Sequence, residues 1–133
     1  MRIALFGTPC SEQFTKYIQH LVSRLEAENI SLLIYEEYLS FLEKKVIFEK
    51  PPKIFDSYHT LKGSADFLFS IGGDGTLLGA VTLVRDSNIP ILGINTGRLG
   101  FISSISTDQI ESAINDVISN NFELKNRTLL SLD

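Results

Sequence analysis

Residues 67–76 read FLFSIGGDGT, a stretch that decides the fold because it joins a buried strand to a glycine-rich turn. Its apolar start predicts a short strand buried on both faces, with the turn at the strand's carboxyl end. In open α/β sheets, ligands bind at that edge. Gly72, Gly73 and Gly75 place no Cβ over the backbone N–H groups, so a bulky anion can approach closely. Asp74 adds a carboxylate that can organise a divalent cation or accept a hydroxyl proton, and the combination favours phosphoryl transfer.

Strands and helices alternate along the chain. Short apolar runs predict strands, and apolar residues at helical spacing predict helices. The predicted strands cover 3–6, 31–35, 67–71 and 91–95, and the predicted helices lie within 14–25, 39–46, 76–85 and 110–118. Ser106 and Gln109 fit a capping box before the last helix. The alternation predicts an α/β fold, a three-layer Rossmann-like and largely parallel sheet with helices on both faces.

The glycine-rich turn also has two purely structural interpretations. Gly-Gly and Asp-Gly favour tight hairpins, which would make 76–84 a second strand. Alternatively, Asp74 is only the N-cap of a helix, a role worth about 1 kcal/mol. A second glycine-bearing turn, GINTGRLGF over 93–101, favours a functional site instead. It also follows an apolar strand, so we expect both turns at the same edge of the sheet, where they would form a cleft.

Composition sets broader limits. The chain has 133 residues, 44% of them hydrophobic, and a net charge of −4, which fits one globular domain and gives no reason to expect nucleic-acid binding. The lone Cys10 excludes an internal disulfide and fits a reducing compartment, and we interpret it as an incidental thiol. His20 is predicted to be a surface residue and His59 to lie in a loop, neither at metal-ligand spacing. With no apolar run near 20 residues, the sequence predicts a cytoplasmic protein without membrane contact.

The carboxyl-terminal end departs from this pattern. Residues 129–132 read LLSL and resemble the start of a strand, yet the chain stops at Asp133. An unpaired apolar strand is an unusual domain end. We therefore expect an N-terminal domain over 1–125 and the start of a truncated, β-rich second domain over 126–133.

Three motifs carry a family resemblance. GGDGT over 72–76 resembles a signature shared by NAD kinases, diacylglycerol and sphingosine kinases and, with small variation, phosphofructokinases. The continuation PILGIN over 90–95 and GRLGF over 97–101 resembles NAD kinases in particular. RTLL over 127–130 resembles the entry into that family's second domain. The resemblance spans the whole chain.

The resemblance implies an activity. NAD kinases transfer the γ-phosphoryl group of ATP, or in some members of polyphosphate, to the 2′-hydroxyl of the adenosine ribose of NAD, and they need a divalent cation. Asp74 matches the catalytic acid that accepts the hydroxyl proton. The residues expected to bind the nucleotides are Gly72, Gly73, Gly75, Thr76, Leu78 and Phe101. For Leu78 and Phe101, core packing is an equally simple interpretation.

One position departs from the family pattern. Many members have a basic residue five positions after the catalytic Asp, where this chain has Gly79. A cation near the phosphates is then missing or comes from Arg85 or Arg98. The family's second domain, with the Asn-Glu pair that holds NAD, does not appear in these residues, so we expect this piece alone to be inactive and the whole protein to be a homo-oligomer. The alternatives are a lipid kinase, against which the motif over 93–101 counts, and a non-catalytic nucleotide-binding module.

Overall fold

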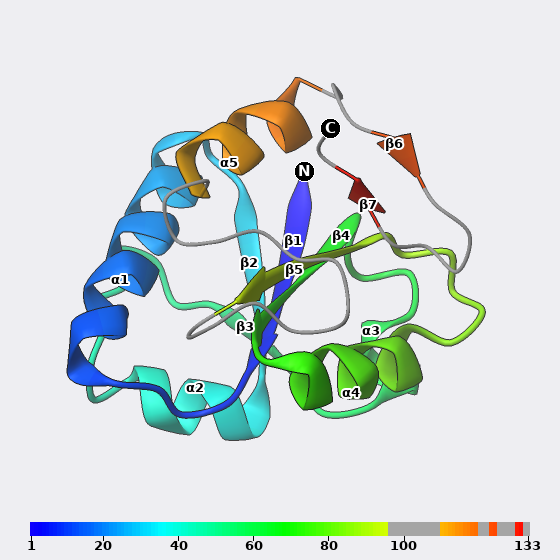
Figure 1. Ribbon diagram of the computed structural model, residues 1–133, viewed down its shortest axis with the longest axis horizontal. Coiled ribbons are helices and arrows are strands. Elements are labelled where there is room, and N and C mark those ends of the chain that lie inside the picture. Colours follow the sequence, from blue (N-terminus) through cyan, green and yellow to red (C-terminus); the bar gives the residue numbers. More distant parts are fainter. Residues whose placement is uncertain (96–109, 120–122, 125–129, 132–133) are drawn as a thin grey trace.

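The computed structural model describes residues 1–95, 110–119, 123–124 and 130–131 (Figure 1). In chain order its elements are β1 (Arg2–Gly7), α1 (Glu12–Ala27), β2 (Ser31–Tyr35), α2 (Glu36–Leu42), β3 (Lys53–Phe55), α3 (Tyr58–Leu61), β4 (Phe67–Gly72), α4 (Asp74–Val84), β5 (Ile91–Asn95), α5 (Ile110–Ile118), β6 (Glu123–Leu124) and β7 (Leu130–Ser131). The predicted alternation of strands and helices is confirmed.

Five strands form one parallel sheet in the order β3-β2-β1-β4-β5. β6 and β7 form a separate antiparallel pair. The central strands are mostly apolar because helices cover both of their faces, as in β4, where all six residues are buried. Among the described residues, no helix is both long and apolar enough to cross a membrane.

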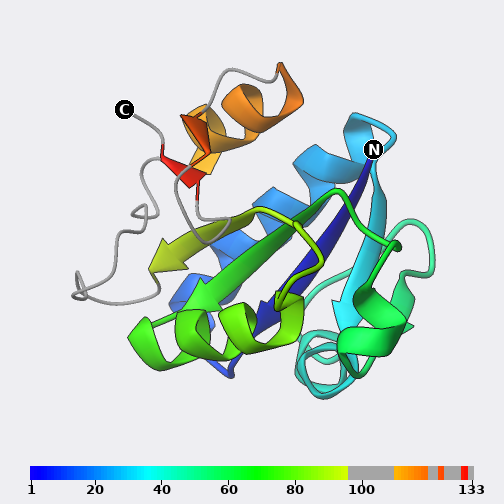
Figure 2. The same ribbon diagram turned by 90° about the vertical axis from the view of Figure 1, so that its right-hand side faces the viewer.

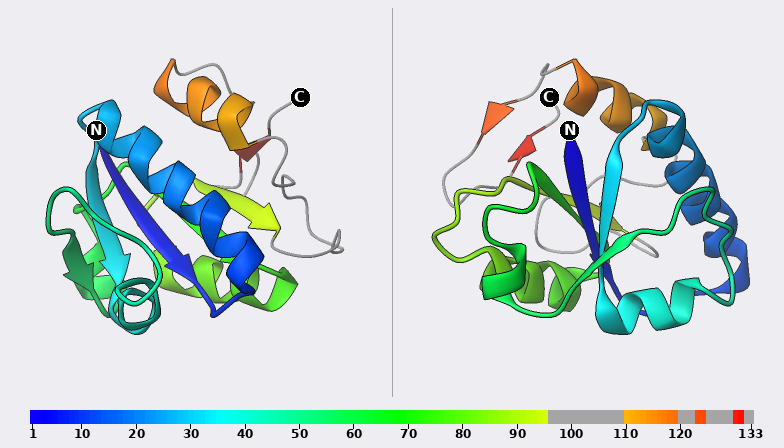
Figure 3. Two further views of the ribbon diagram at one scale, coloured as in Figure 1. Left: turned by 90° about the vertical axis from the view of Figure 1, so that its left-hand side faces the viewer. Right: turned by 180° about the vertical axis from the view of Figure 1, so that it is seen from behind.

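The apolar core lies in two layers, one on each face of the sheet. One layer joins alternate strand residues such as Ile3 and Phe69 to α1, α2 and α5. The other joins Ala4 and Leu68 to α3 and α4. Figure 2 shows α4 in front of the sheet, and the left view of Figure 3 shows α1 in front from the opposite side. This is the predicted three-layer α/β arrangement.

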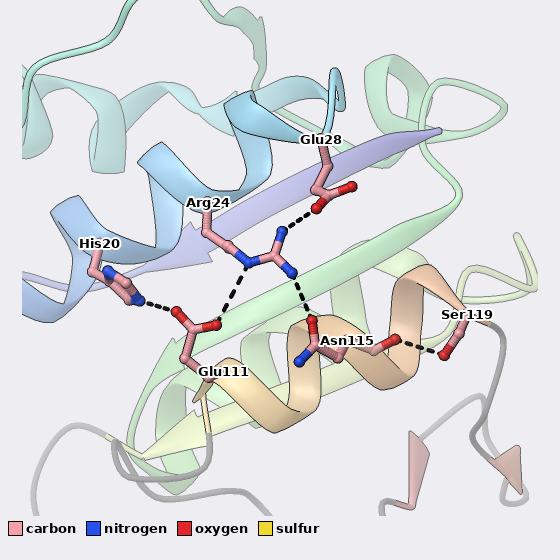
Figure 4. Close-up of polar contacts among 6 residues, drawn as sticks. All are labelled: His20, Arg24, Glu28, Glu111, Asn115 and Ser119. Carbon is pink, nitrogen blue, oxygen red and sulfur yellow. Dashed lines mark hydrogen bonds and ion pairs between the residues drawn. The ribbon is translucent and has the colours of Figure 1, made fainter.

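A group of polar contacts fastens α5 to α1 (Figure 4). Arg24 donates to Asn115 Oδ1 at 2.6 Å, and its Nε lies 3.5 Å from Glu111 Oε2. Arg24 also pairs with Glu28, and His20 with Glu111. His20 is exposed, as predicted. Exposed pairs of this kind contribute little individually, so the buried apolar face of α5 supplies most of its docking free energy.

Three predictions of local structure were wrong. β3 was not predicted, and His59 lies in the one-turn helix α3 rather than in a loop. α2 begins at Glu36 and ends at Leu42, although the buried Val46 extends its apolar spacing. Val46 lies in the turn that follows the helix, and its N–H donates to the Leu42 carbonyl at 2.8 Å. Its side chain is therefore buried although the helix has already ended. Ser106 and Gln109, the expected capping box, lie outside the described residues.

Candidate active site

The sheet has a topological switch point between β1 and β4. β1 leads into α1 on one face of the sheet, whereas its neighbour β4 leads into α4 on the other. Chain connections that leave adjacent strands in opposite directions open a crevice beyond the strands' carboxyl ends, where α/β proteins bind ligands. The glycine-rich turn with Asp74 lies at this point. The fold therefore places the predicted site where a site is expected on topology alone.

Asp74 is the first residue of α4 rather than its cap. The N-cap is Gly73, with extended backbone angles (φ −104°, ψ −162°) and no side-chain capping bond, and Leu77 N donates to its carbonyl at 3.1 Å. The hairpin interpretation is therefore wrong, because the turn precedes a helix, and the N-cap position belongs to Gly73 rather than to Asp74. The half-buried carboxylate lies in the first turn, where backbone N–H groups and the helix dipole favour negative charge.

The three glycines of the turn are not equivalent. A Cβ on the buried Gly72 would lie 2.4 Å from Thr76 Oγ1 and 2.8 Å from Thr76 Cβ. A Cβ on Gly73 or Gly75 would meet nothing within 4 Å, and both residues are exposed. Gly72 is thus required by packing against Thr76, whereas Gly73 and Gly75 leave the outer side of the turn open.

The loop after β1 also belongs to this site, which the sequence analysis missed. The hydroxyls of Thr8 and Thr76 hydrogen-bond, with their Oγ1 atoms 3.4 Å apart, and Thr8 N donates to the Ile71 carbonyl at 3.4 Å. The buried Thr76 therefore joins the start of α4 to the loop that leads into α1. Only the strand order brings these loops together, and no local sequence signal carries that order.

The strand that leads into the second glycine-bearing turn ends at the expected edge. β5 runs parallel to β4 with Asn95 opposite Gly72, so both strands end at the same edge of the sheet. Phe101 and Arg98 lie outside the described residues. A small recess opens between these strand ends and α4; its lining residues are Ser70, Gly72, Gly73, Asp74, Leu77, Gly93 and Ile94.

The structure distinguishes the two interpretations of Leu78. Its side chain is 59% exposed, one turn after Asp74, so it is not part of the core. Gly79 packs against β1, because a Cβ there would lie 3.3 Å from the ring of Phe6. Arg85 lies at the far end of α4, where its guanidinium is 5.1 Å from the ring centroid of Tyr58. Arg85 is therefore not the cation that replaces a basic residue at position 79.

Two other titratable groups lie near the loop after β1. Burial, assisted by the charge of Glu12, raises the pKa of the Cys10 thiol, and burial also raises the pKa of the Tyr38 phenol. Cys10 is thus held as a thiol, in agreement with its interpretation as an incidental residue. No group of three or more His, Cys, Asp or Glu that could hold a metal ion occurs in the described part of the chain.

Comparisons with known proteins agree with this geometry. The family described as ATP-NAD kinase N-terminal domain matches residues 3–122. The chain is 38% identical over 132 residues to the NAD kinase of Christiangramia forsetii and 40% identical over 134 residues to that of Cytophaga hutchinsonii. Each match covers 99% of this chain and 45% of the relative, so the chain spans about half the length of the curated relatives it matches. The crystal structure of yeast NADH kinase complexed with NADH shares the fold, with a TM-score of 0.72 at 17% identity over 95% of this chain and 43% of that one.

Proposed function

Because the chain belongs to the NAD kinase family, we propose that the protein containing it transfers the γ-phosphoryl group of ATP to the 2′-hydroxyl of the adenosine ribose of NAD. The observation that carries this proposal is the position of Asp74. Its carboxylate stands at the start of α4, at the switch point of the sheet and on the wall of a recess. Passive anion binding needs no carboxylate there, whereas activation of a hydroxyl does.

In the proposed reaction, Asp74 orients the 2′-hydroxyl and takes its proton as the oxygen attacks the γ-phosphorus, the bond from that phosphorus to the β–γ bridging oxygen breaks, and ADP leaves. A secondary hydroxyl is a poor nucleophile, and a positioned base contributes about 10²–10⁴-fold to such a step. The first-turn N–H groups of α4 would stabilise phosphate oxygens. Gly73 and Gly75 favour this approach because no side chain covers the outer side of the turn.

The family resemblance also implies a divalent cation. Mg²⁺ keeps several waters and typically takes one or two protein carboxylates together with substrate phosphates. A site with a single carboxylate fits that mode, because substrate phosphates and water can supply most of the ligands, and Asp74 keeps its proposed role as the base. The cation would neutralise charge on the phosphates, and ATP and water oxygens would complete its coordination.

The remaining site assignments are part of the same proposal. Leu78 would contact NAD, since it is exposed on the helix that carries Asp74. Thr76, one of the residues expected to bind the nucleotides, is buried, so we propose that it supports the turn from beneath through its bond to Thr8. Phe101 would line the NAD pocket. Residues 126–133 would begin a second domain that completes the cleft, so that residues 1–133 alone would be inactive. We further propose that the whole protein is cytoplasmic and homo-oligomeric.

The test is formation of NADP⁺ from NAD, ATP and Mg²⁺ by the full-length protein and by Asp74→Asn. We expect at least a hundredfold lower kcat in the variant, with a free energy of unfolding that falls by no more than about 1 kcal/mol through loss of the first-turn charge. Asp116→Asn, at a half-buried position on α5, is the matched control and should retain full activity. Equal loss of folding and activity in Asp74→Asn would assign Asp74 a structural role. Turnover of a diacylglycerol-type alcohol in place of NAD would assign the chain to the lipid kinases instead.

A further inference from the structure

Ser70 is a buried polar residue that the proposed function does not use. It lies in the middle of β4 with 2% of its surface exposed, and its Oγ has no hydrogen-bond partner among the described residues. Buried hydroxyls almost always have a partner, because an unsatisfied one loses its bonds to water without replacement. We therefore expect the Ser70 hydroxyl to have a hydrogen-bond partner at this position.

The sheet register shows where that partner would lie. Ser70 pairs with Phe6 of β1 and Gly93 of β5, and residues in register point to the same face of the sheet. Gly93 has no side chain, so space remains on that side of Ser70. The recess there has a volume of about 10 Å³ and is also lined by Gly73 and Asp74. A volume of this size holds about one water molecule.

We propose that Ser70 binds a single water molecule in this recess and thereby acts as a positioning residue for the turn that carries Asp74. A buried water needs two to four polar partners. Ser70 Oγ would be one partner, and the others would be polar groups of the residues that line the recess. The water would link β4 and β5 to the base of α4, whose N-cap makes no side-chain bond of its own.

The position of this water explains why a hydroxyl is kept inside an apolar strand. Ser70 is two residues before Gly72 and on the same side of the strand, directly beneath the turn. An apolar residue of similar size would leave the recess dry and the turn without this support. The effect on catalysis rests on the proposed function, whereas binding of the water does not.

Ser70→Ala in the full-length protein tests the water directly. A hydroxyl that truly lacked a partner would be replaced at no cost or with a gain in stability. If the hydroxyl holds a structural water, its removal should instead lower the Tm by about 3–6 °C. Ser31→Ala, at an exposed position of β2, is the matched control and should change Tm by less than about 1 °C. An unchanged or raised Tm in Ser70→Ala would overturn the proposal.

Crystallography and kinetics supply independent readouts. A crystal structure at better than about 1.5 Å resolution should show one water within hydrogen-bond distance of Ser70 Oγ. The same water should be absent from the Ser70→Ala crystal. An empty recess in the wild type would refute the proposal. Kinetically, we expect kcat to fall about tenfold while KM for NAD and ATP stays within about twofold, because only 2% of the Ser70 surface is exposed. An equal change in kcat and KM would exclude the positioning role. If the wild type did not phosphorylate NAD, the proposed function would fail while the Tm and crystallographic results still decided the water site.

Discussion

Gly72→Ala is the substitution for which the structure makes the sharpest prediction. Ordinary contacts of a Cβ begin at 3.4 Å, and the new methyl group would lie 2.4 Å from Thr76 Oγ1, about 1 Å too close. Thr76 cannot simply rotate away, since its Cβ is also only 2.8 Å from the new atom. The start of α4 must therefore shift, and the contact with the Thr8 hydroxyl is lost with it. Overpacking typically costs about 1–3 kcal/mol, so we expect the free energy of unfolding to fall by about 2 kcal/mol.

Gly75→Ala is the matched control, in the same turn and with the same added methyl group. Its Cβ would meet nothing within 4 Å, and alanine favours the helical backbone. We expect its free energy of unfolding to rise by about 0.5 kcal/mol. Urea unfolding followed by circular dichroism measures both variants. If Gly72→Ala were as stable as Gly75→Ala, the close packing of Gly72 on Thr76 would be refuted.

A double-mutant cycle tests the cause of the Gly72→Ala defect. Thr76→Ala removes Oγ1 and Cγ2, two of the three atoms that the new methyl group would approach, but leaves Cβ. The defect of Gly72→Ala should therefore be smaller, by about 1 kcal/mol, in the Thr76→Ala background. Additive effects of the two substitutions would mean that the defect arises elsewhere in the turn.

Two further predictions concern the loop after β1. The Tyr38 hydroxyl is buried and has no partner among the described residues, but unlike Ser70 it does not line the recess between β4 and β5. Tyr38→Phe should therefore leave the free energy of unfolding unchanged or raise it by up to about 1 kcal/mol, and a loss above 1 kcal/mol in urea unfolding would contradict this. The pKa of Cys10 is raised by burial and then by Glu12, so the folded protein keeps the thiol proton at a pH where the unfolded chain loses it. The rate of Cys10 alkylation by iodoacetamide at pH 8 should be lower than that of free cysteine and should increase as the pH rises. The Glu12→Gln variant should be alkylated faster than the wild type. A rate equal to that of free cysteine would show that the thiol is not shielded.

The elements that sequence predicted well are those with strong local patterns. The strands over 31–35 and 91–95 have the predicted bounds, and α1 carries the predicted apolar stripe. β3 has no such pattern: Lys53 and Ile54 are both exposed, and the strand exists because it pairs with β2. Pairing between distant segments leaves no local periodicity, so neither this edge strand nor the strand order was predictable.

The same limit applies to the candidate site. Asp74 and its glycines were identified because they lie together in sequence, and the structure places them on one turn. Thr8 and Ser70 were missed because each joins the site through an adjacent strand. A buried serine in an apolar run resembles any other strand residue until the register shows Gly93 opposite it. The residues themselves are visible in the sequence, but the strand order and register that bring them together are not.

Gly79 links this packing to the chemistry of the site. Position 79 faces β1 so closely that a Cβ would lie 3.3 Å from the ring of Phe6. The absence of a side chain at position 79 lets α4 lie close to β1. At its start, α4 is held in place by the close packing of Thr76 on Gly72. A basic side chain at 79 would have to push Phe6 aside or change the position of the helix that carries Asp74. Arg85, the arginine that follows α4, lies at the opposite end of the helix against Tyr58, so a basic side chain for the phosphates would have to come from outside α4.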